Sequence, residues 1–451
     1  MGKSPATRGV YAGSNGSIAS DAILQTKGFG VFAYYTGTKS YANYDTYDTD
    51  DGTKVSAIAP NFMWNQHIDY NSTITGDWGY SPVKYWPNES TSGTSIDGNS
   101  AGTDYANGGN VSFFAYAPYV PAAVGGTVTG TPGEGIVSFS SNSTTGDPIV
   151  NYMIPAAKAD FVDLLWGTTA TNGETVLGTA QNGISHNGSG NNYQKAIIYD
   201  GSTGYTVNAD LTKQKTNGRV GFAFKHALAK LGGGAGSGFQ IITDVDQDNT
   251  DPYISGGTLG TDTRVTVESI NISVKALTDA THWVNSKQAA LNLATGAWTP
   301  STTTTETTMY TYSITGADLN TQIKDPGLTA WDTGLQDISG VPSSSAVSVY
   351  ANADATPLLL FPGTKPVLDI EIAYYVNTHD PNLQGAIARV KQVIKKQISF
   401  TSAVELNKFY RMTIHLGLTS VKFTASVSNW DDATGADATA VSKIDLPINV
   451  H

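Results

Sequence analysis

Short segments in which apolar and polar residues alternate recur along most of this 451-residue chain. Such alternation is typical of β-strands with one buried face, because successive side chains of a strand point to opposite sides of its sheet. Turn dipeptides such as Asp51-Gly52 and Asn217-Gly218 separate the segments. Many short strands joined by polar loops predict β-sandwiches. We expect strands at 29–35, 111–119, 220–224, 265–274, 368–376, 412–418 and 421–427.

Two segments fit a helical period. Residues 155–166 begin with a proline suited to a first helical turn and carry apolar residues at helical spacing. Residues 387–398 fit either a basic amphipathic helix or a strand, and the pattern leaves both open. A helix there would more often be a solvated surface face than a membrane binder.

The composition favours an all-β surface protein over an intracellular enzyme. Aromatic residues make up 10% of the chain, charged residues only 14%, and glycine is abundant with 48 residues. The net charge of −12 argues against a nucleic-acid partner, since phosphate binding needs a basic face. The absence of cysteine excludes disulfides and thiolate metal sites. No apolar run reaches the ~18 residues of a transmembrane helix, and we expect any targeting segment to have been removed.

The chain is long enough for two domains. Polar, Gly- and Asn-rich stretches end near residue 217, where the apolar pattern restarts, and they predict a boundary at about residue 216. We therefore predict an N-terminal β-sandwich domain over 1–216, with a leading segment at 1–28, and a C-terminal one over 217–430. Residues 431–451 follow as a linker and a final strand.

That final strand has no later segment of its own chain to pair with. Its apolar side chains alternate with polar ones and fall on one face: Ile444, Leu446, Ile448 and Val450. The small, polar stretch at 431–440 is typical of a flexible tether. A tethered amphipathic strand can complete its own sheet or add to the sheet of a neighbour.

No catalytic motif stands out. The seven histidines are scattered, and the sequence has no HExxH, GxSxG or phosphate-loop pattern. The best metal candidate is the alternating set Asp244, Asp246 and Asp248, because calcium prefers several carboxylate oxygens. The segment lacks the glycine and the final glutamate of an EF-hand loop, so an acidic hairpin loop is the better interpretation. We expect no cofactor and no enzymatic activity.

Aromatic residues cluster at 78–80 and 84–87. They fit a sugar-stacking platform, or core packing at strand ends, and the second interpretation is the more common in all-β proteins.

Six segments in order resemble the fimbrillins, the type V pilus subunits of Bacteroidales: 84–87, 111–119, 224–231, 291–298, 358–363 and 406–430. Each motif is weak alone, but together they extend over nearly the whole chain. The resemblance implies two tandem transthyretin-like β-sandwich domains with a C-terminal extension strand.

The resemblance also implies a function. Subunits of this family are exported as lipoprotein precursors and displayed in a cell-surface fimbrium. A trypsin-like protease cuts after an arginine, and removal of the first strand opens a groove that a terminal strand of another subunit fills. The matching positions here are Arg8 and Gly9, and residues 444–450 would be the donor strand. The lipoprotein cysteine and the strand before the arginine are missing from this sequence.

The resemblance implies other fimbrial subunits as partners, in a homopolymer, and a host or bacterial surface receptor. An alternative is a tip or accessory adhesin of the same pilus system, with a glycan- or protein-binding loop face. A stalk subunit needs both a donor strand and an acceptor groove, so the intact strand at 444–450 favours the stalk.

Overall fold

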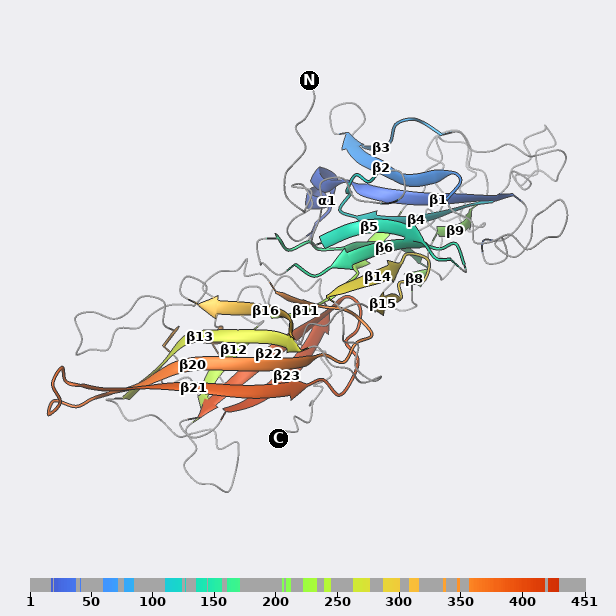
Figure 1. Ribbon diagram of the computed structural model, residues 1–451. Coiled ribbons are helices and arrows are strands. Elements are labelled where there is room, and N and C mark those ends of the chain that lie inside the picture. The colour runs from blue at the N-terminus through green and yellow to red at the C-terminus, as the bar shows by residue number, and fades with distance from the viewer. Residues whose placement is uncertain are drawn as a thin grey trace. The chain divides into compact units, whose positions relative to one another are not determined.

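The computed structural model describes residues 18, 20–37, 41, 60–71, 77–84, 110–123, 126, 135–143, 145–155, 160–170, 205–206, 208–211, 222–232, 239–244, 263–275, 287–300, 308–315, 336–337, 347–348, 357–417 and 421–429. These residues form strands and one short helix, so the fold is all-β as predicted (Figure 1). No helix in this part of the chain is long and apolar enough to cross a membrane.

The chain divides into two compact units. Unit 1 comprises Met1–Met153, Val162–Ala227 and Gln288–Thr299, and unit 2 comprises Ile154–Phe161, Leu228–Lys287 and Pro300–His451. The boundary predicted near residue 216 lies outside the described residues. Unit 1 includes a short segment, Gln288–Thr299, that lies well beyond residue 216 in the sequence.

Unit 1 contains an eight-stranded and a four-stranded sheet (Figure 1). The order in the larger sheet is β10-β7-β4-β1-β2-β3, with β8 beside β7 and β9 beside β4. The smaller sheet has the order β15-β14-β6-β5. The larger sheet comprises β1 (Phe29–Gly37), β2 (Met63–Asn71), β3 (Asp77–Gly79), β4 (Asn110–Ala117), β7 (Leu165–Ala170), β8 (Tyr205–Thr206), β9 (Asn208–Leu211) and β10 (Ala223–His226). The smaller comprises β5 (Gly135–Ser141), β6 (Pro148–Met153), β14 (Gln288–Asn292) and β15 (Trp298–Pro300).

Aromatic side chains pack between these two sheets. The ring of Phe139 on β5 lies 5.5 Å from that of Phe32 on β1 and 4.9 Å from that of Tyr116 on β4. Gly30 has to be glycine here, because a Cβ atom would lie 2.2 Å from Cε1 of Tyr116. The Tyr34 hydroxyl donates to the Gly146 carbonyl at 2.6 Å. Unit 1 is thus a sandwich with an aromatic core.

Unit 2 also contains two sheets. The six-stranded sheet has the order β18-β12-β22-β11-β19, with β23 beside β22. The five-stranded sheet has the order β16-β13-β20-β21, with β17 beside β13. The first comprises β11 (Ala229–Leu231), β12 (Phe239–Asp244), β18 (Val347–Ser348), β19 (Leu358–Leu360), β22 (Lys408–Gly417) and β23 (Val421–Asn429). The second comprises β13 (Thr263–Lys275), β16 (Thr308–Thr315), β17 (Gln336–Asp337), β20 (Val367–His379) and β21 (Ile387–Ser399).

Neither of the two segments with helical spacing forms an α-helix in its described part. Residues 387–398 belong to strand β21, which pairs with β20 along its whole length. The helix predicted at 155–166 is wrong over its described part, because Leu165 and Trp166 lie in β7 and pair with β4. The apolar side chains there are buried in a sheet core, and that burial overrides the helical spacing. The helix that does exist, α1 (Asp21–Lys27), was not predicted.

Candidate functional site

The larger sheet of unit 1 has a second apolar face, on the side away from the four-stranded sheet. Along β1, Phe29, Val31 and Ala33 point to this side, while Phe32 and Tyr34 point to the sandwich core. One face of an antiparallel sheet is commonly solvated, so an apolar second face needs a cover. We call it the outer face; it comprises Phe29, Val31, Ala33, Met63, Ile68, Val111, Phe113, Ala115, Ala117 and Leu165, all buried.

Part of the cover comes from the N-terminal side of the chain: Ile18 and helix α1. Ile18 is buried within the outer-face cluster, and Ile23 and Leu24 of α1 pack against it in part. The helix lies at the start of β1 in Figure 1 and contacts β2. It begins after Ser20, whose hydroxyl accepts from the Ile23 N–H at 3.4 Å, and it ends at Gly28, whose φ is 65°.

Few apolar side chains of this cover are fully buried. No residue of α1 is fully buried. Complete burial of an aliphatic side chain stabilises by about 1.5–3 kcal/mol, and among Ile18, Ile23 and Leu24 only Ile18 reaches that condition. Segments with few buried contacts open at lower free energy than the core. Apart from its polar anchors, the cover is therefore easier to displace than the sheet on which it lies.

The first anchor is a buried carboxylate. Asp163 Oδ2 accepts the Ile18 N–H at 2.8 Å, and Asp163 Oδ1 lies 2.7 Å from His226 Nδ1. The two side chains are 0% and 4% exposed. A buried carboxylate needs such partners, because burying a charge without them costs several kcal/mol. The pair fixes the start of the cover to β10 and to the segment before β7.

Lys27 at the end of α1 interacts electrostatically with the same carboxylate. Burial lowers the pKa of Lys27, and the negative charge of Asp163 opposes that shift. An Asp–His pair also occurs in catalytic triads. Here both side chains are closed off from solvent, so their geometry suits holding a chain segment rather than meeting a substrate.

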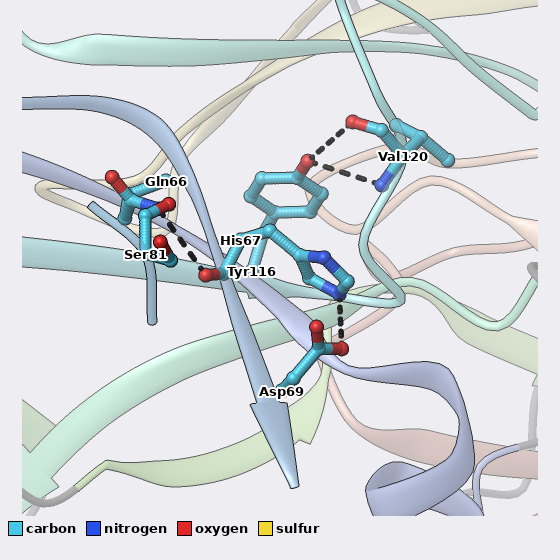
Figure 2. A network of polar contacts seen from close by, with 6 residues as sticks. All are labelled: Gln66, His67, Asp69, Ser81, Tyr116 and Val120. Atoms are coloured by element: carbon cyan, nitrogen blue, oxygen red, sulfur yellow. Dashed lines mark hydrogen bonds and ion pairs between the residues drawn. The ribbon is translucent and has the colours of Figure 1, made fainter. Parts of the chain in front are cut away.

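The second anchor lies where the helix joins β1. The Tyr119 N–H donates to the Gly28 carbonyl at 3.2 Å. The ring of Tyr119 stacks on that of His67 at 3.8 Å between centroids. A Cβ atom on Gly28 would lie 2.6 Å from His67 Nε2, so only glycine allows this close approach. His67 in turn lies 2.8 Å from Asp69, as Figure 2 shows.

Burial lowers the pKa of His67, and the neighbouring Asp69 carboxylate opposes this shift. Because burial is the larger effect, His67 is neutral near pH 7 and stacks on Tyr119 without a charge.

A buried hydrogen-bond network supports the second anchor from the sandwich side. Figure 2 shows its contacts between the Tyr116 hydroxyl and the backbone of Val120. The Tyr116 hydroxyl donates to Asn65 Oδ1 at 2.6 Å, and the Asn65 amide donates to the Val120 carbonyl at 3.0 Å. Asn65 has a φ of 45°, a left-handed conformation that asparagine tolerates better than most residues. Burial raises the pKa of Tyr116 well above its usual value, so this hydroxyl stays a donor.

Aromatic side chains close the outer face beside β1. Phe29 makes edge-on contacts with Trp78 at 5.0 Å, Phe222 at 5.7 Å and Phe224 at 5.3 Å. Trp78 also packs on Tyr70. This packing supports the core interpretation of Trp78 over a sugar-stacking platform. Tyr85 and Trp86 lie outside the described residues.

Most residues proposed from the sequence are not among those that the structure describes. Arg8 and Gly9, the strand at 444–450, Asp246 and Asp248 all lie outside the described residues. Asp244 is the last residue of β12 and pairs with Gly417. Within the described ranges, no three His, Asp or Glu side chains are grouped to hold a metal ion.

Neither anchor was predicted from the sequence. One signal was available for the first: Asp163 stands alone in the apolar run from Phe161 to Trp166. A lone charged residue in such a run predicts a buried polar partner, but not which one.

No protein-family model matches the chain, and no curated protein matches its sequence. Among solved structures, a fimbrial protein from Bacteroides vulgatus is similar, with a TM-score of 0.55 and 17% identity. The match covers 90% of this chain and 93% of that one. A protein from Bacteroides uniformis assigned to cell adhesion has a TM-score of 0.33 and 14% identity, covering 90% and 92% of the two chains. The first likeness shows a shared fold over most of both chains.

Proposed function

We propose that this protein is a structural subunit of a cell-surface fimbria that polymerises by strand exchange and supports adhesion. The observation that carries the proposal is the second apolar face of the large sheet in unit 1, which has to be covered by further chain segments. The shared fold with a fimbrial protein supports the same class.

The proposed exchange uses both ends of the chain. Cleavage between Arg8 and Gly9 by a trypsin-like protease would remove a preceding strand and open an acceptor groove on unit 1. Ile18 follows the cleavage point and would stay bound to Asp163, because its N–H donates to that carboxylate. The strand with Ile444, Leu446, Ile448 and Val450 would then enter the groove of a neighbouring subunit. Export as a lipoprotein precursor and a surface receptor belong to this proposal.

Electron microscopy of the full chain, carrying a precursor strand before Arg8, tests the proposal. We expect filaments after cleavage at Arg8 and none from an Arg8→Ala chain treated in the same way. Deletion of residues 441–451 should leave both units folded and abolish filaments. Filaments from the truncated chain would contradict a C-terminal donor strand.

A matched pair of charge substitutions sharpens the test. The double variant Ile444→Asp with Leu446→Asp should prevent assembly, because two unpaired charges cannot enter an apolar groove. Asn449→Asp places a charge on the opposite face of the same strand and should leave assembly intact. Normal filaments from the double variant would point to a different donor. A tip adhesin would cap filaments of other subunits without forming its own.

A further inference from the structure

Strand β21 forms one edge of the five-stranded sheet of unit 2. All its residues from Ile387 to Ser399 pair with β20 without a shift in register. Among the described strands, none lies along its other side. A regular strand of 13 residues at a sheet edge presents a row of backbone N–H and C=O groups to another chain.

Proteins usually protect such edges with short strands, bulges, proline or charged side chains, above all lysine. β21 is long and regular and has no proline, so among these devices it has only charge. Its middle part, from Arg389 to Val393, is exposed on both faces of the sheet. Val390 and Val393 point to opposite faces and are 52% and 50% exposed. These two valines give an added strand apolar contacts on either side.

The charge on β21 is opposite to that of the whole chain. The strand carries four basic and no acidic side chains, Arg389, Lys391, Lys395 and Lys396, in a protein with a net charge of −12. Lys391 pairs with Glu268, and Lys395 Nζ lies 2.7 Å from a Glu371 oxygen. Lys395 is still 77% exposed, so its ammonium group can meet a second carboxylate from solvent.

We propose that β21 binds an extended acidic segment of another protein, which adds to the sheet as a further strand. Main-chain hydrogen bonds supply affinity, and carboxylates beside Lys395 and Lys396 supply selectivity. The same lysines disfavour a second copy of β21 at this edge, because like charges would face each other across the new pair. The charge thus selects an acidic strand over self-pairing. This proposal is independent of strand exchange on unit 1.

The test uses the full chain and a synthetic peptide of about ten residues, in which valine alternates with glutamate and threonine; that length spans about 33 Å of strand. Fluorescence anisotropy measures binding, and hydrogen exchange locates it. We expect the peptide to slow amide exchange within β21. A peptide with lysine in place of glutamate should bind roughly tenfold more weakly.

Two variants of equal net charge separate a local effect from a general one. Lys395→Gln with Lys396→Gln should weaken binding roughly tenfold. Lys287→Gln with Lys408→Gln removes the same charge away from β21 and should leave binding unchanged. Equal weakening by both variants would overturn the proposal.

Three other results would also overturn it. The first is equal binding of a peptide whose alternate backbone nitrogens are methylated, because that peptide cannot form a ladder. The second is equal protection of β21 by heparin, a polyanion without peptide groups. The third is protection of β21 without peptide that grows with protein concentration, which would make a second copy the occupant.

Discussion

The eight-stranded sheet of unit 1 and the five-stranded sheet of unit 2 differ in the polarity and burial of their outer sides. In unit 1 the outer side is apolar and buried, from Phe29 on β1 to Leu165 on β7. In unit 2 one side of β20 is buried through Ile370 and Ile372, while Glu371 on the other side pairs with Lys395 in solvent. The first sheet needs a further layer to be stable in water, and the second does not.

The two strands at the centre of these sheets already differ in sequence. β1 begins with an unbroken apolar run, Phe29 to Tyr35, as expected of a strand with two buried faces. β20 interrupts its apolar residues with Asp369 and Glu371, as expected of a strand with one solvated face. A sheet face without charges therefore indicates a face that other segments cover.

The largest effect is expected from removing the Asp163 carboxylate, which anchors the cover of unit 1. Asp163→Ala leaves His226 and the Ile18 N–H without their buried acceptor. We expect unit 1 to lose about 3–5 kcal/mol of unfolding free energy, measured by urea denaturation. Asp369→Asn on the exposed side of unit 2 is the matched control, with an expected change within about 0.5 kcal/mol. Similar losses for both would show that the cover is not specially anchored.

A smaller effect is expected at the second anchor. Tyr116→Phe removes the hydroxyl that donates to Asn65 Oδ1 and leaves that oxygen buried. The expected cost is about 1–3 kcal/mol of unfolding free energy. Hydrogen exchange should show faster exchange of the Tyr119 amide, which bonds to Gly28. A stable variant with unchanged exchange at that amide would show that the hydrogen-bond network of Tyr116 does not support the anchor between Tyr119 and Gly28.

The smallest effect concerns pH and contrasts two lysines. Burial lowers the pKa of Lys225, beside Trp166 in unit 1, to about 8, whereas Glu371 raises the pKa of exposed Lys395 in unit 2. Between pH 8 and 10.5, Lys225 is protonated in the unfolded chain but neutral in the folded one, so unfolding free energy should rise with pH. Lys225→Met should remove this rise, and Lys395→Met should not. Calorimetry across that range would measure both, and a persisting rise in Lys225→Met would exclude Lys225 as its source.

The local sequence pattern was sufficient to predict the positions of several strands but not which strands pair with one another. Alternation predicted β13, β20, β22 and β23 close to their observed bounds. It could not show that β14, at Gln288–Asn292, pairs with β6 in unit 1 rather than with its sequence neighbours. Five residues with burial on alternate positions fit any sheet that offers an edge, so their partner depends on the rest of the fold.

The missed helix and the wrong helix have related causes. Helix α1 has seven residues, too short for a clear helical period, and its serine and glycine caps were its main signal. The run at 160–166 has helical spacing, but its apolar side chains are buried and its last two residues pair with β4 as part of β7. Local caps define the first segment and burial in the core decides the second, so apolar spacing was a poor guide to both.

The sequence by itself determined the all-β class, the strand-rich halves and the positive charge of β21, because side-chain alternation and charge are local properties. Only the tertiary structure decided that Ile18, Asp163 and His226 meet, since their positions in the sequence are far apart. It also decided that β21 lies at an edge while β20 lies inside the same sheet. The sequence pattern of neither strand shows this, because only the pairing of whole strands distinguishes a buried position from an exposed edge.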